Sequence, residues 1–273
     1  MKITVLVENT EGSAHCPCQH GLSCLIETAD HLILFDTGQD ELLLENAERL
    51  GADLSLVDTV ILSHGHYDHG GGLLSFLRCN HTARIYMQDT AFGPYYSMRA
   101  DGPHYIGLPQ ELRGQSQIIS IHGDHQIDEN LFLLADIPVR VPIPSANRPL
   151  RRKEQEDYVP DSFDHEQCLL IKEQNHLYLF CGCAHHGIRN ILMAVQELFH
   201  QEPDAVFGGF HLKKNDGYTE SDLLEIQKTA KVLSETHTVY YTGHCTGLEP
   251  YEQMRDVMHD QLHYMHCGDV ITL

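Results

Sequence analysis

The chain has 273 residues, of which 18 are Lys or Arg and 39 are Asp or Glu, so its formal net charge is −21 at pH 7. Such an acidic chain is not expected to bind a nucleic-acid backbone or an anionic membrane surface, because both carry negative charge. A negatively charged small substrate stays compatible with it, since metal ions can reverse the local sign of a pocket.

The N-terminal stretch, the hydropathy and the cysteines bear on the compartment. The opening MKITVLVENTEG alternates like a short strand and lacks the apolar stretch of a secretory signal. No apolar run reaches the roughly 20 residues that a membrane span requires. Nine cysteines, an odd number, indicate reduced thiols rather than a disulfide framework. We therefore expect a cytoplasmic protein.

Hydrophobic periodicity and turn residues predict the elements in chain order. Strands are expected at 3–7, 23–28, 31–38, 59–63, 83–87, 176–183, 205–212, 238–245 and 268–273. Helices are expected at 40–51, 72–79, 187–200, 220–236 and 251–260. The regular alternation of strand and helix in the second half is typical of an α/β layered fold.

Residues 139–165, VRVPIPSANRPLRRKEQEDYVPDSFDH, are rich in proline and charge and too long for an ordinary connection. We expect a long loop at about 140–165, either a lid or a solvated excursion. Its basic residues are Arg148, Arg151, Arg152 and Lys153. This cluster could bind a phosphate or carboxylate of a substrate, or the acidic residues Glu154, Glu156 and Asp157 could neutralise it.

The stretch SHGHYDHGGG at 63–72 follows the apolar run TVIL and contains four side chains that bind metals, His64, His66, Asp68 and His69. In an extended segment His64 and His66 point the same way, while Asp68 and His69 turn toward a second position. Imidazole and carboxylate are usual ligands of zinc, manganese and iron, and paired ions can catalyse hydrolysis. The motif therefore predicts two adjacent metal sites, and histidines of a polar surface turn are the alternative.

HisXHisXAspHis after an apolar strand resembles the signature of the metallo-β-lactamase superfamily. LFDTG at 34–38, with Asp36, is similar to the strand and turn that precede the metal loop in these proteins. The resemblance implies a single domain over 1–273 of α/β class, a four-layer αβ/βα sandwich with the metals at one edge between two sheets. It also implies two divalent metal ions, zinc in the first place, with manganese or iron as alternatives.

A narrower resemblance rests on HGLSCLIE at 20–27, GCAHHGI at 182–188, GGFHL at 208–212 and GHCTG at 243–247. Together these stretches are similar to the dihydropteroate-synthase-like branch of the superfamily. Its namesake members make 7,8-dihydropterin-6-methyl-4-(β-D-ribofuranosyl)aminobenzene 5'-phosphate. The resemblance covers about residues 1 to 273.

The superfamily supplies its remaining metal ligands from the ends of later strands, which implies His244 here, together with Cys183 and His185, either of which could complete the site. Cys183 falls where most members carry an aspartate that bridges both ions, and a thiolate there would favour zinc over manganese. His186 is not expected to be a ligand. His165, in DSFDHEQC, could be the superfamily's middle histidine or a surface residue.

The roles of three further positions stay open in the sequence. His211, in GGFHL, could protonate a leaving group, bind the substrate or be a buried structural histidine. His20 could face the same pocket as a substrate-binding residue. Cys16 and Cys18 could bind a metal or act in redox chemistry, with ordinary loop cysteines as the simpler interpretation.

These residues predict a dinuclear metal-dependent hydrolase that attacks an ester or phosphoester of a small molecule with a metal-bound hydroxide. Asp68 would bind metal and orient that hydroxide, and His211 would protonate the leaving group. The alternative is a transferase that joins a dihydropterin diphosphate to an aminobenzene ribosyl phosphate. Di-iron redox chemistry fits less well, because iron members of the superfamily usually carry Glu where His66 stands. A metal-binding sensor would keep the ligands but lack a proton donor.

Overall fold

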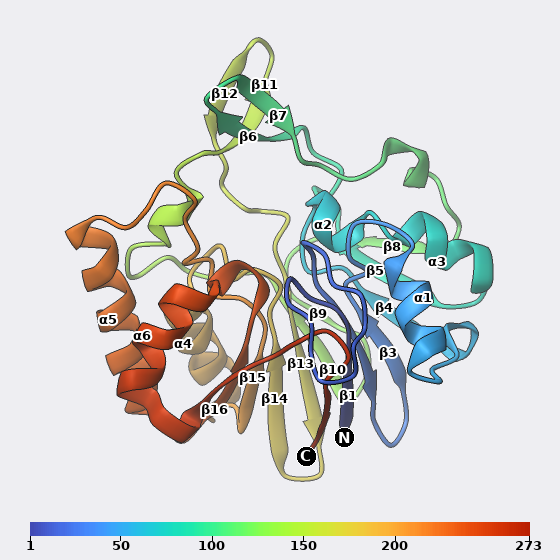
Figure 1. Cartoon of the computed structure of the whole chain (residues 1–273). Helices are drawn as coiled ribbons and strands as arrows, with labels where there is room; N and C mark the ends of the chain where they lie inside the picture. Colours follow the sequence, from blue (N-terminus) through green and yellow to red (C-terminus); the bar gives the residue numbers. More distant parts are fainter. The chain divides into compact units, whose positions relative to one another are not determined.

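The computed structural model describes residues 1–273 and divides the chain into two compact units. The first unit comprises residues 1–123, 149–167 and 265–273, and the second comprises residues 124–148 and 168–264. Each unit combines segments that are far apart in the sequence, and each has a seven-stranded sheet with helices (Figure 1). None of the helices is both long enough and apolar enough to cross a membrane.

The main sheet of the first unit has the order β18-β1-β2-β3-β4-β5-β8. Its strands are β1 (Lys2–Val7), β2 (Ser23–Glu27), β3 (Leu32–Phe35), β4 (Thr59–Ile61), β5 (Arg84–Gln88), β8 (Ile118–Ile121) and β18 (Val270–Thr272). From β3 to β8 the strands run parallel, and β4 is buried along its whole length, as expected for an inner parallel strand. Helices α1 (Leu42–Arg49) and α3 (Leu73–Cys79) share one apolar core with these strands.

The first unit also contains a small antiparallel sheet, with the order β12-β11-β6-β7. Its strands are β6 (Tyr95–Arg99), β7 (Gly102–Tyr105), β11 (Leu150–Glu154) and β12 (Asp157–Pro160). Part of the segment expected as a loop therefore forms a hairpin, and that hairpin pairs with β6. These strands were not expected, because charged residues interrupt the alternation that marks a strand.

Pairing in the small sheet divides the basic cluster. Arg152 lies opposite Tyr95 and Arg151 lies opposite Tyr96, so these two neighbouring arginines point to opposite faces of the sheet. Arg152 forms ion pairs with Glu154 and Asp164. The cluster is therefore not one continuous basic surface, and part of its charge is neutralised within the chain.

The main sheet of the second unit has the order β17-β16-β15-β14-β13-β10-β9. Its strands are β9 (His125–Gln126), β10 (Leu131–Leu134), β13 (Cys168–Glu173), β14 (His176–Phe180), β15 (Ala205–Phe207), β16 (Val239–Thr242) and β17 (Leu262–Tyr264). Strands β14 to β17 are parallel. Helices α4 (Ile188–Phe199), α5 (Glu220–Ser234) and α6 (Leu248–Met258) bury their apolar residues in the same core as these strands. The carboxyl ends of β14, β15 and β16 thus lie at one edge of this sheet.

Helix α5 begins with a capping box that also fastens the preceding segment of the second unit. Thr219 and Asp222 exchange side-chain and backbone hydrogen bonds at the first turn. The Asp222 carboxylate also accepts from Lys214 Nζ at 2.6 Å and from Ser145 Oγ at 2.8 Å. The hydrogen bond from Lys214 holds the pKa of Asp222 well below its ordinary value of 3.8.

Replacement of Asp222 by Asn is expected to lower the free energy of unfolding by about 1–3 kcal/mol at pH 7, because Lys214 loses its charged partner. The pKa of Asp222 is depressed in the folded state, so its contribution is present above pH 3.8 and is lost as the pH falls toward the folded value. Urea titrations of both proteins at pH 7 and at decreasing pH measure the difference, which should shrink in acid. Glu220→Gln, an exposed carboxylate on the same helix, is the matched control and should change little.

Candidate metal centre

The histidine motif of the first unit occupies the loop after β4 and the short helix α2 (Tyr67–Gly70). His64, His66, Asp68 and His69 are all buried. The ring centroid of His64 lies 4.5 Å from that of His66 and 4.1 Å from that of His69. A β-carbon on Gly71 would lie 2.2 Å from the backbone oxygen of Gln39, so glycine is required for the close approach of these two segments. The four predicted ligands of this motif are therefore brought together within one unit.

One buried carboxylate, that of Asp36, fixes two of these imidazoles. It accepts from His69 Nδ1 at 2.6 Å and from both Ser63 N and Ser63 Oγ at 2.7 Å. Because the Ser63 hydroxyl donates to Asp36, its oxygen accepts from His64 Nδ1 at 2.8 Å. Both rings thus carry their proton on Nδ1, and the lone pair lies on Nε2. This is the tautomer of a metal-binding histidine that is oriented through its other nitrogen.

The protonation states in this group suit metal binding. Burial lowers the pKa of His64 well below its usual range, and burial together with neighbouring His165 lowers the pKa of His66 to about 3. Both rings are therefore neutral near pH 7, which is the form that binds metal. His20, which is half exposed, lies with its Nε2 3.1 Å from Asp68 Oδ2. This predicted substrate-binding residue accordingly contacts the predicted catalytic carboxylate.

His165 lies beside the motif but is held differently. Its Nδ1 accepts from the backbone N–H of Gly65 at 2.9 Å, so its Nε2 carries the proton and faces Asp161 Oδ2 at 3.2 Å. Burial raises the pKa of Asp161, but the hydrogen bond and charge of His165 outweigh burial and lower it overall. The ring of Tyr95 packs on His165 at 3.9 Å between centroids. Both nitrogens of His165 therefore bind protein groups, an arrangement that suits a positioning residue better than a ligand.

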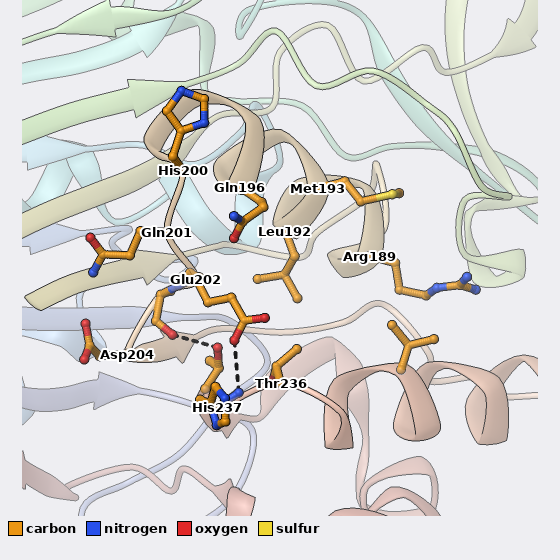
Figure 2. A pocket seen from close by; sticks show the side chains of 13 residues that line it. Arg189, Leu192, Met193, Gln196, His200, Gln201, Glu202, Asp204, Thr236 and His237 are labelled. Carbon is orange, nitrogen blue, oxygen red and sulfur yellow. Dashed lines mark hydrogen bonds between the residues drawn. The ribbon is translucent and has the colours of Figure 1, made fainter.

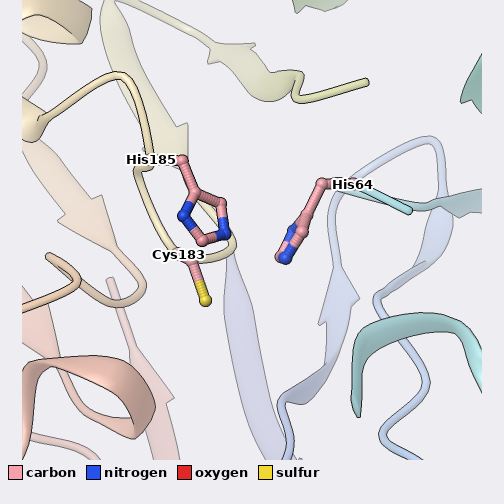
Figure 3. Close-up of side chains that lie close together, drawn as sticks. All are labelled: His64, Cys183 and His185. Carbon is pink, nitrogen blue, oxygen red and sulfur yellow. The ribbon is translucent and has the colours of Figure 1, made fainter. Parts of the chain in front are cut away.

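The second unit carries its candidate ligands on the loops that follow β14, β15 and β16. Cys183 and His185 come from one loop, and both side chains appear in Figure 3. Asn147 holds His185 twice, because its Oδ1 lies 2.8 Å from His185 Nδ1 and its Nδ2 donates to the His185 backbone oxygen at 2.8 Å. An amide oxygen can only accept, so His185 also carries its proton on Nδ1 and its lone pair on Nε2.

His211 and His244 follow the next two strands. Both have φ of +50°, a left-handed conformation that is unusual for a residue other than glycine and often found at functional sites. The ring of His211 lies 4.3 Å from that of His185 between centroids. Cys245, next to His244, lies close enough to Cys183 and His211 for the ligand atoms of all three to fall within 4.8 Å of one another.

The donor set of each unit fits a divalent metal ion. Imidazoles, a carboxylate and thiols at the ends of buried strands are the groups that zinc prefers. Three of the imidazoles already have the tautomer that a metal requires. The residues that create this tautomer, Ser63 and Asn147, were not recognised in the sequence, and Asn147 lies 38 positions from its partner, so no local pattern could have revealed it.

Three further residues that the sequence singles out are not members of these groups. Cys16 is buried and Cys18 is exposed, and neither belongs to any group of three residues placed to hold a metal. His186 is buried, and its backbone oxygen accepts from Asn190 of α4. Asp161 and Cys245 are additional residues of the two groups that sequence reasoning missed.

Comparison with known proteins assigns this α/β fold with candidate metal ligands to a family. Residues 17–237 match the model of the metallo-β-lactamase superfamily. The chain therefore belongs to the metallo-β-lactamase superfamily, which confirms the family and the α/β sandwich class expected from the sequence.

Relatives of similar length bear out the narrower resemblance. An uncharacterized protein of Methanocaldococcus jannaschii is 28% identical over 99% of this chain and 100% of its own length. The 7,8-dihydropterin-6-methyl-4-(β-D-ribofuranosyl)-aminobenzene-5'-phosphate synthase of the same organism is 27% identical, over 99% of this chain and 96% of its own. Among solved structures, the metal-dependent hydrolase Tm1679 of the β-lactamase superfamily is 28% identical with a TM-score of 0.82, over 100% of this chain and 99% of that one.

Replacement of Asn147 by Ala is expected to lower the affinity for zinc about 10- to 100-fold, because His185 loses the partner that orients its ring. Competition with a chromophoric chelator measures the dissociation constant. Ser145→Ala, which removes the neighbouring hydrogen bond to Asp222 and leaves Asn147 in place, should retain the affinity of the unchanged protein. Equal affinities for both variants would show that Asn147 does not orient a ligand.

Proposed function

We propose that the protein is a metal-dependent hydrolase of a small-molecule ester or phosphoester. The proposed ligands of two divalent ions, zinc in the first place, are His64, His66, Asp68, His69, Cys183, His185 and His244. The observation that carries the proposal is the shared tautomer of His64, His69 and His185, each with Nδ1 held by the chain. Membership of the superfamily and the similarity to a structure described as a metal-dependent hydrolase support it.

Bound metal ions would supply Lewis acidity and lower the pKa of a water molecule. The chain's own part begins with Asp36 and Asn147, which orient imidazoles. Asp68 would orient the attacking water. One oxygen of the Asp68 carboxylate lies 3.1 Å from His20 Nε2. For His211 two roles suit its position, namely protonation of the leaving group, as expected from the sequence, and metal binding together with the neighbouring thiols.

The structure bears on how an anionic substrate would be attracted. Arg152 is paired with Glu154 and Asp164, and Arg151 points to the opposite face of the small sheet. The predicted basic cluster is therefore a poor phosphate site as a whole. A phosphate-bearing substrate would depend chiefly on bound metal ions for its charge compensation. A lid at about 140–165 remains a proposal, now with the β11–β12 hairpin as its structured part.

A transferase is the second candidate, because the full-length relative in Methanocaldococcus jannaschii carries the name of a synthase. In the transferase that we consider, an aromatic amine would take the place of water as the nucleophile. Metal-loaded protein that releases diphosphate from a dihydropterin diphosphate only when an aminobenzene ribosyl phosphate is present would favour the transferase. Hydrolysis of esters or phosphodiesters without any amine would favour the hydrolase.

Replacement of His64 or His244 by Ala is expected to reduce bound zinc and to lower hydrolysis of a panel of phosphodiesters, phosphomonoesters and lactones at least about 100-fold. Elemental analysis of the purified variants and initial rates provide the two readouts. His186→Ala, a neighbouring histidine outside the proposed ligand set, is the control and should keep both. Full zinc content in His244→Ala would remove His244 from the ligand set.

A chelator should abolish the same activity, and added zinc should restore it. Activity that survives complete removal of metal would contradict the proposed mechanism.

A further inference from the structure

Three side chains of the second unit converge from three neighbouring parallel strands. Cys183 follows β14, His211 follows β15 and Cys245 follows β16. Carboxyl ends of adjacent parallel strands meet at one sheet edge, and here the candidate ligand atoms of all three residues lie within 4.8 Å of one another. Cys245 was not among the ligands expected from the sequence.

The backbone around Cys245 is shaped to place its sulfur. A β-carbon on Gly209 would lie 2.2 Å from Cys245 Sγ, so only glycine leaves room for the sulfur there. Cys245 Sγ accepts from the backbone N–H of His211 at 3.3 Å, an interaction that stabilises negative charge on sulfur. Both thiols are shielded from water, with Cys183 3% and Cys245 7% exposed.

The imidazole of His211 has a nitrogen that lacks a partner. Its Nδ1 is buried and forms no hydrogen bond. A buried polar atom in that state destabilises the folded chain unless another group satisfies it. The left-handed backbone of His211 adds strain, and the loop is held by the hydrogen bond of the Phe210 N–H to Thr246 Oγ1 at 2.8 Å. The unsatisfied nitrogen and the left-handed backbone of His211 therefore both destabilise the folded chain.

We propose that Cys183, His211 and Cys245 bind one soft divalent metal ion, zinc in the first place. Two sulfurs and one nitrogen leave a fourth position for water or substrate, which is the pattern of a catalytic rather than a structural zinc site. The proposal deepens the proposed function, because Cys183 belongs to both ligand sets and Cys245 becomes a ligand. It also assigns His211 to metal binding rather than to protonation of a leaving group.

The second unit contains another pair of neighbouring cysteines, Cys168 and Cys181, which lie in the apolar core. Cys168 Sγ lies 3.6 Å from Cys181 Sγ, and both belong to the apolar core with Leu170 and Leu179. Neither belongs to a group of side chains placed to hold a metal. Cys168 is therefore a matched control for the loss of one buried thiol near another.

The test uses the full chain, stripped of metal and loaded with one equivalent of Co²⁺. Sulfur-to-cobalt charge-transfer absorption reports the number of bound thiolates. Cys183→Ser and Cys245→Ser should each lose about half of the intensity, because each removes one of two sulfur ligands. Cys168→Ala should retain all of it. Full intensity in Cys245→Ser would overturn the proposal.

X-ray absorption of the unchanged zinc protein gives a second readout that needs no variant to fold. About two sulfur neighbours per zinc at roughly 2.3 Å, in protein loaded with one equivalent, support the assignment. One sulfur or none contradicts it. The sulfur count is independent of turnover, so zinc protein with two sulfur ligands that hydrolyses no substrate would refute the proposed function and leave this assignment intact.

Discussion

The buried carboxylate of Asp36 is the interaction on which the arrangement of the first unit depends. It sits just after β3 and accepts hydrogen bonds from Ser63, just after β4, and from His69 in α2. A fully buried carboxylate destabilises the folded state unless both of its oxygens accept hydrogen bonds. The donors Ser63 N, Ser63 Oγ and His69 Nδ1 must therefore stay in place. Asp36 thereby links two strand ends to the metal loop and sets the tautomers of two histidines.

The second unit reaches the same chemical result with different groups. There the neutral amide of Asn147 has the role that the Asp36 carboxylate has in the first unit. It accepts from the ring of His185 and donates to the backbone oxygen of the same residue. Asn147 lies in a segment that Ser145 and Asp222 fasten to the start of α5. In both units, buried polar groups orient imidazole rings, and this arrangement suits the binding of metal ions.

The sequence was sufficient for the parts of the fold that local patterns encode. Strands β1 to β5, β14 to β16 and β18 and helices α1, α3, α4, α5 and α6 follow from hydrophobic periodicity, and the histidine motif follows from spacing alone. The inner strands β10 and β13 of the second unit were not expected. The small sheet was missed because Arg151, Arg152 and Lys153 hide its alternation. The roles of Asn147 and Cys245 could not be predicted either, because each depends on contacts between distant segments. Local propensity says nothing about which strand ends will share an edge.

The claim that the histidines are set for metal before any metal binds can be tested by nitrogen-15 NMR of the metal-free protein. The structure predicts that His64, His69 and His185 each carry a proton on Nδ1, because Ser63, Asp36 and Asn147 accept from that nitrogen, and that the lone pair lies on Nε2. Added zinc should then shift the Nε2 resonances of these rings. Rings that are protonated at both nitrogens, or that carry the proton on Nε2, would contradict the account.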